Sequence, residues 1–159
     1  MSYSSTSISK IDYANTLTAS LAYLMINQQD AVGLIQFSDK INTFLPPKSK
    51  KSHLNTLLGQ LSQNVKGEDT FIEPVLHEMA DRINKRGLVI LISDLLDDPE
   101  KIMKGLKHFR HRKQEVIVFH VLDRQELEFN FNERTKFIDV ETGEEISTEP
   151  WHIKKKYKE

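Results

Sequence analysis

Two polar loops carry the side chains best suited to chemistry. Asp94 stands just beyond the apolar run 88–92, and Thr70 precedes a long amphipathic pattern. Hydroxyl and carboxylate oxygens in loops at strand ends suit Mg²⁺, which prefers six oxygen ligands and gives up its waters reluctantly. Both residue types also cap loops and helices, with no metal involved. For this chain we favour the capping interpretation over a tightly bound metal.

The histidines are a second group that could bind a metal. His108 and His111 are three residues apart near a predicted helix end. Cationic side chains at that end also interact favourably with the helix dipole, and we favour this explanation over metal ligation. His77 and His120 fall in or beside apolar stripes, so we interpret them as core or boundary residues rather than catalytic ones.

The usual sequence signatures of an enzyme are missing. The chain has no G-x-x-x-x-G-K-[ST] loop, no G-x-G-x-x-G turn and no G-x-S-x-G elbow. It also has no cysteine, which excludes a thiolate nucleophile, a disulfide framework and a cysteine-ligated zinc. We therefore predict a protein that is not an enzyme, and the absence of cysteine is compatible with the reducing cytoplasm.

Charge and hydropathy narrow the choice of partner. The 22 lysines and arginines nearly balance the 23 aspartates and glutamates, so no overall field favours nucleic acid or an acidic surface. The basic runs 48–51, 110–113 and 154–158 read as solvated faces, and no aromatic residues interleave with them as single-stranded nucleic acid would require. No stretch approaches the ~20 apolar residues of a membrane span. We predict a protein partner, with no nucleic acid and no membrane span.

Helical and extended patterns alternate along the chain. Ser9 and Asp12 form a capping-box-like start, Asp98 and Pro99 open a second clear helix, and Gly87 is a candidate C′ residue that closes the helix before it. The predicted order is a helix over 9–27, strands over 31–37 and 41–45, a short helix over 54–61, a helix from 70 to 86, a strand over 88–92, a helix over 98–113, a strand over 115–122, a hairpin over 135–146 and a final helix from 148.

This alternation predicts an α/β fold: a doubly wound, mostly parallel sheet with helices on both faces. The runs 31–37, 88–92 and 116–121 have little polar alternation, so we expect them to be buried strands. Binding in such sheets occurs at the carboxyl ends of the strands. The length fits a single domain over 1–159, and the abrupt end of the last helix at Glu159 predicts that this domain is partial.

The run Ser93–Pro99 and the segment Gly67–Thr70 resemble the von Willebrand factor A-like domains of bacterial proteins grouped as domain of unknown function 58. The resemblance covers nearly the whole chain and implies a Rossmann-like topology. Other segments that fit the family are the first helix from Ser9, Gln29–Leu34, Leu45–Pro47 and Phe119–Asp123.

The resemblance also implies a site. Such domains hold Mg²⁺ or Mn²⁺ in a metal-ion-dependent adhesion site built from D-x-S-x-S after the first strand, a threonine and a later aspartate. Thr70 and Asp94 match the second and third elements, whereas the first is absent and Phe71 replaces an acidic residue common in relatives. With so few oxygens we expect Mg²⁺ or Mn²⁺ to bind no more tightly than roughly millimolar.

By the same resemblance, the chain is a protein-interaction module that works with a MoxR-type AAA+ ATPase in the assembly or maturation of other proteins. Asp69, Thr70, Asp94 and Asp97 would contact the partner. Met1 aligns with the methionine that follows D-x-S-x-S, which places the first strand upstream of it. That strand lies between 31–37 and 88–92 in this fold, so we expect unpaired strand edges and either self-association or marginal stability.

A receiver-like phosphotransfer domain is the alternative. A buried strand that ends in Asp94-Leu95-Leu96 superficially matches the phosphoacceptor strand of a response regulator. Receivers also need an acidic pair after their first strand and a lysine later in the chain, and neither requirement is met here.

Overall fold

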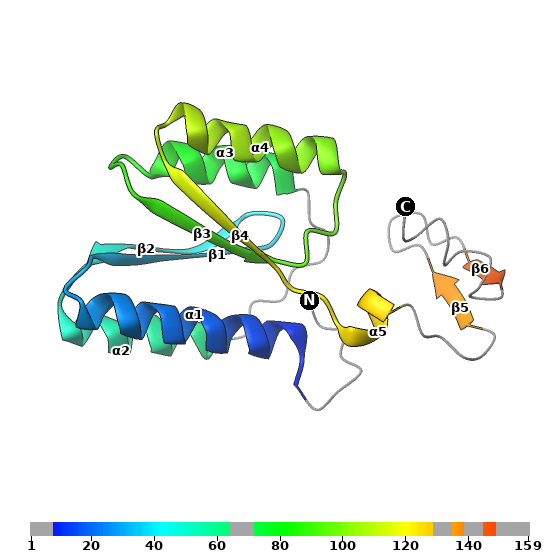
Figure 1. Cartoon of the computed structure of the whole chain (residues 1–159), viewed down its shortest axis with the longest axis horizontal. Coiled ribbons are helices and arrows are strands. Elements are labelled where there is room, and N and C mark those ends of the chain that lie inside the picture. Colours follow the sequence, from blue (N-terminus) through cyan, green and yellow to red (C-terminus); the bar gives the residue numbers. More distant parts are fainter. Residues whose placement is uncertain (1–7, 64–71, 129–134, 139–144, 149–159) are drawn as a thin grey trace.

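Helices lie on both sides of the strands between residues 32 and 120 in a three-layer arrangement (Figure 1). The structure is a computed structural model, and it describes residues 8–63, 72–128, 135–138 and 145–148. The helices are α1 (Lys10–Asn27), α2 (Lys51–Leu61), α3 (Ile72–Arg82), α4 (Pro99–His111) and the short α5 (Arg124–Glu128). The strands are β1 (Val32–Phe37), β2 (Ile41–Lys48), β3 (Leu88–Ser93), β4 (Glu115–His120), β5 (Thr135–Ile138) and β6 (Glu145–Thr148).

The predicted helix starts are confirmed at two places. Ser9 is the N-cap of α1: its hydroxyl accepts a hydrogen bond from the Asp12 amide at 3.1 Å and donates to the Asp12 carboxylate at 2.6 Å. Asp98 caps α4 by accepting a hydrogen bond from the Glu100 amide at 2.8 Å, and Pro99 fills the first helical position. Both starts rest on local hydrogen bonds, which is why the sequence predicts them.

The strands form pairs rather than one continuous sheet. β1 pairs with β2 and β5 with β6, both antiparallel, while β3 and β4 pair in parallel from Leu88↔Glu115 to Ser93↔His120. The structure is thus α/β with one parallel pair among the described residues, and the expected single, mostly parallel sheet is not seen. No hydrogen-bonded ladder joins β1 to β3 in the described chain. β1 and β3 therefore each keep one edge that pairs with no other described strand.

Two apolar clusters fill the space between the layers, and β1 contributes to both because successive side chains of a strand point to opposite faces. One face of β1 carries Leu34 toward the first cluster, which joins α1 to α2. The other face carries Ile35 and Phe37 toward the cluster between the strands and the helices α3 and α4. Leu76 is fully buried at the centre of that second cluster. β1–β2 and β3–β4 thus share a core although they share no hydrogen bonds.

Some details of the sequence prediction are wrong. The runs 31–37 and 88–92 are only partly buried, with Leu34 and Leu91 as their buried residues. β4 is not buried on both faces: Val116 and Val118 pack against the core, whereas Ile117 and Phe119 are 46% and 37% exposed, because no described element covers their face fully. Gly87 does not close the preceding helix, which ends at Arg82.

The linker before β3 is held by a side chain instead of a C′ glycine. The buried Gln114 accepts a hydrogen bond from the Gly87 amide at 2.7 Å and donates one to the Lys85 carbonyl at 2.8 Å. A glutamine distant in sequence therefore satisfies backbone groups of this linker.

Within the described part of the chain, no helix combines the length and apolar character needed to cross a membrane.

Candidate functional site at the strand ends

Asp94 lies directly after β3, where it meets the first residue of α1. The Asp94 carboxylate is 11% exposed, and its Oδ2 lies 3.2 Å from the Nζ of Lys10, whose side chain is only 4% exposed. The backbone carbonyl of Asp94 contacts the His120 Nε2 at 3.0 Å, which ties the end of β3 to the end of β4. The predicted site residue is thus part of a buried ion pair.

Glu126 on α5 completes the cluster around the same ammonium. Its two oxygens accept hydrogen bonds from the Lys10 Nζ at 2.8 and 3.1 Å. Glu126 Oε2 also accepts from the Asp123 amide at 2.8 Å, and the buried Asp123 carboxylate accepts from the Gln125 amide at 2.8 Å. One lysine therefore connects α1, the end of β3 and the turn after β4.

The charge state of Lys10 follows from these contacts. Burial lowers the pKa of the Lys10 ammonium, but the hydrogen bonds and charges of Glu126 and Asp94 more than offset it. The pKa of Lys10 therefore lies above its ordinary value of 10.5. Lys10 is a permanent cation at neutral pH.

These residues do not fit a divalent metal. A divalent cation bound to the Asp94 oxygen would sit roughly 5 Å from the ammonium, and at an effective dielectric constant of ~20 their repulsion would be about 7 kcal/mol. Among the residues that the structure describes, no group of three or more histidine, cysteine, aspartate or glutamate side chains could hold a metal ion. The expected partner of Asp94, Thr70, lies outside the described residues, as does Asp69.

The Asp97 carboxylate accepts hydrogen bonds from two backbone amides. Its Oδ2 accepts a hydrogen bond from the Ile72 amide at the start of α3, at 2.9 Å, and its Oδ1 accepts from the Asp98 amide at 2.6 Å. The side chain is 7% exposed. Asp97 therefore joins the starts of α3 and α4, a role that the prediction of partner contact did not include.

The loop after Asp94 presents an apolar residue to solvent. Leu95 has a φ of 48°, a left-handed conformation that is unfavourable for a side chain of this kind. The loop is held by a hydrogen bond from the Leu95 amide to the Ser93 hydroxyl at 3.1 Å and one from the Asp97 amide to the Leu95 carbonyl at 2.9 Å. Leu96, between these anchors, is 67% exposed.

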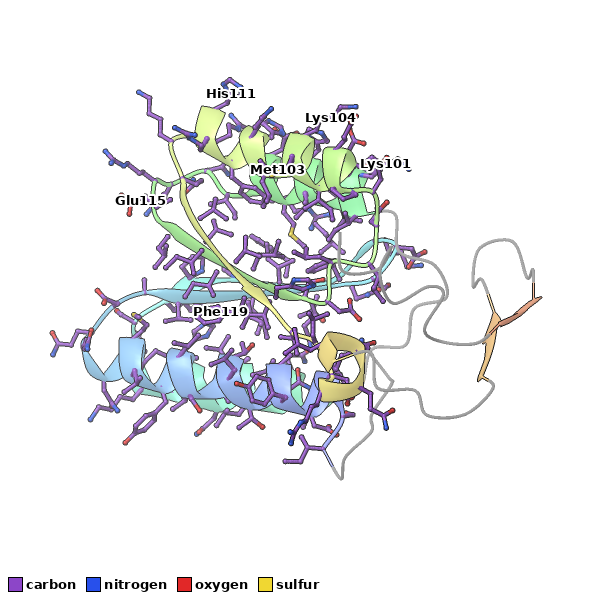
Figure 2. All side chains as sticks on the ribbon, turned by 45° about the vertical axis from the view of Figure 1, so that its right-hand side comes forward. Lys101, Met103, Lys104, His111, Glu115 and Phe119 are labelled. Carbon is purple, nitrogen blue, oxygen red and sulfur yellow. The ribbon has the colours of Figure 1, made fainter. Side chains whose placement is uncertain are left out.

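His108 pairs with a histidine of another helix and not with His111, its neighbour in the sequence. His108 turns toward α3, where its Nδ1 lies 2.8 Å from the Nδ1 of His77. His111 is exposed and projects from α4 away from the strands, as does Lys104 (Figure 2). His108 and His111 therefore do not converge on one ion, and His77 is half-exposed at the α3–α4 contact.

Sequence reasoning missed Lys10 and Glu126 as site residues. Lys10 reads as an ordinary helix-start residue, and Glu126 lies in a segment with no strong pattern. No local pattern in the sequence marks either residue, because they meet only across the fold.

Together these features define an α/β domain with a charged cluster at the carboxyl ends of its parallel strands. The chain belongs to the family described as "Protein of unknown function DUF58", whose family model matches residues 1–159. Neither a curated protein nor a solved structure matches the chain.

Proposed function

We propose that this chain is a non-enzymatic protein-interaction module of von Willebrand factor A type. It would work with a MoxR-type AAA+ ATPase in the cytoplasm, assisting the assembly or maturation of other proteins. Membership of the family of unknown function supports the resemblance from which this proposal starts. The loop after β3, near Asp94, is the proposed docking region.

Leu96 is the observation that carries the proposal. A leucine that is 67% exposed in a loop fixed on both sides by hydrogen bonds offers a partner an apolar anchor at little cost in conformational entropy. The left-handed Leu95 beside it is unfavourable locally, and such backbone strain is concentrated at functional sites.

The aspartates on either side of Leu96 in the chain, Asp94 and Asp97, hold this loop in place. Asp94 is paired with Lys10, and Asp97 accepts hydrogen bonds from two backbone amides. In this proposal they position the docking loop rather than contact the partner through a tightly held metal. Binding of Mg²⁺ or Mn²⁺ is proposed to be no tighter than roughly millimolar.

The test is the affinity for the MoxR-type ATPase of the same organism, measured with Leu96→Ser. If Leu96 is an anchor, we expect the dissociation constant to rise at least about tenfold. Leu88→Ser is the matched control, because Leu88 is 49% exposed at the start of β3, whereas the docking loop follows the other end of that strand. Equal affinities of the two variants for the ATPase would show that the loop after β3 is not the docking region. If the unaltered chain does not bind the ATPase, the ATPase is not its partner.

Phosphotransfer on Asp94 remains the alternative proposal. The contact between Asp94 and Lys10 favours it in one respect, since a lysine beside the acceptor is a receiver feature. The low exposure of the carboxylate disfavours it, because a phosphoryl donor must reach the acceptor oxygen. Binding of a phosphate analogue such as beryllium fluoride that is lost in Asp94→Asn would support this alternative over docking.

A further inference from the structure

The Lys10 ammonium occupies the place that a cation would take between Asp94 and Glu126. Three carboxylate oxygens from Asp94 and Glu126 lie within 3.2 Å of its Nζ, and the side chain is shielded from solvent. Carboxylate oxygens converging on one cation are the ligands that hard divalent metals prefer. Here the cation is covalently part of the chain.

We propose that Lys10 is the resident cation of the strand-end site and excludes divalent metals from it. The ammonium neutralises Asp94 and Glu126, so the chain gains nothing by taking up Mg²⁺ or Mn²⁺ there. The same Glu126 carboxylate accepts a hydrogen bond from the Asp123 amide, which ties the turn after β4 to this charged cluster. Removal of the ammonium converts the cluster into a metal site.

Two substitutions of Lys10 that differ in side-chain size distinguish the effect of losing the positive charge from the effect of opening space for an ion. Lys10→Ala removes the cation and leaves room for an ion with its waters, which divalent cations of this kind retain. Lys10→Met also removes the cation but fills most of the same volume. The proposal therefore predicts a larger gain in metal binding for the alanine variant than for the methionine variant.

The experiment is a titration of the whole chain with Mn²⁺, following the free ion by electron paramagnetic resonance and the melting temperature of the protein in parallel. We expect the unaltered chain to bind Mn²⁺ no better than roughly millimolar and Lys10→Ala at least about tenfold more tightly. Mn²⁺ should also raise the melting temperature of Lys10→Ala alone. The gain should disappear in Lys10→Ala/Asp94→Asn and in Lys10→Ala/Glu126→Gln.

Two results would overturn the proposal. One is micromolar binding by the unaltered chain that Asp94→Asn abolishes, since metal and ammonium would then coexist. The other is a folded Lys10→Ala variant with no gain in affinity. Should that variant fail to fold, Lys10→Arg keeps the cation, and Mn²⁺ binding by it that is tighter than millimolar would equally refute the proposal. None of these measurements involves the partner ATPase, so their outcome is separate from that of the docking test.

Discussion

At the scale of the residue, the buried ammonium of Lys10 stabilises the fold, and this stabilisation is lost at alkaline pH. Its pKa in the folded chain lies above the ordinary value of 10.5, which also applies to the unfolded chain. A raised folded-state pKa means that the stabilisation is complete below the unfolded value and is lost as the pH rises through the folded value.

The comparison that isolates this effect is the free energy of unfolding of the unaltered chain minus that of Lys10→Met. We expect a difference of about 3–5 kcal/mol at neutral pH, because the methionine leaves the buried Asp94 carboxylate and the partly buried Glu126 carboxylate without their counter-charge. The difference should stay constant up to about pH 10 and then fall. Urea unfolding at a series of pH values measures it. A difference that already falls near neutral pH would contradict the ionised state of Lys10 described above.

At the scale of the element, the contact between α3 and α4 depends on a glycine. A Cβ atom added at Gly105 would lie 2.7 Å from both the Cβ and the Cδ1 of Leu76, closer than real side chains approach. Because Leu76 is fully buried, it has little room to move. We expect Gly105→Ala to lower the free energy of unfolding by about 1–3 kcal/mol through overpacking.

Gly59→Ala is the matched control, since Gly59 also lies within a helix but a Cβ there would meet nothing within 4 Å. Alanine should stabilise the chain by up to about 1 kcal/mol at that position, as the better helix former. Thermal or urea unfolding measures both variants. If packing against Leu76 causes the effect at Gly105, the two changes in the free energy of unfolding have opposite signs. Destabilisation of similar size in both would place the effect in the helices themselves and not in their contact.

At the scale of the whole molecule, the separate pairs β1–β2 and β3–β4 leave inner edges without a ladder between them in the described residues. Unpaired edges invite pairing with another chain. We expect the mass measured by light scattering to rise with protein concentration, or the melting transition to be low and broad. Hydrogen exchange of the β1 and β3 amides should slow in the associated form.

A strict monomer with a high, cooperative melting transition would count against this expectation. It would mean that β1 and β3 pair directly with each other in solution. Exchange rates would then be independent of concentration. The two outcomes are distinguished without any variant of the chain.

The sequence by itself determined the features that depend on neighbouring residues. The caps at Ser9 and Asp98 are hydrogen bonds over two or three positions, so residue types and spacing suffice to predict them. The sequence predicts a hairpin over 135–146, and the structure pairs β5 with β6, which extends two residues further to Thr148. The final helix predicted from 148 lies outside the described residues, apart from its first position, which belongs to β6.

Only the tertiary structure decided which distant groups meet. Lys10 and Glu126 are 116 positions apart, and no local pattern couples them. Their contact arises because α1 begins beside the ends of β3 and β4, where burial makes an unpaired carboxylate costly. The exposed face of β4 has the same origin. Its continuous apolar run is compatible with burial on both sides, but a strand is buried only where another element covers it.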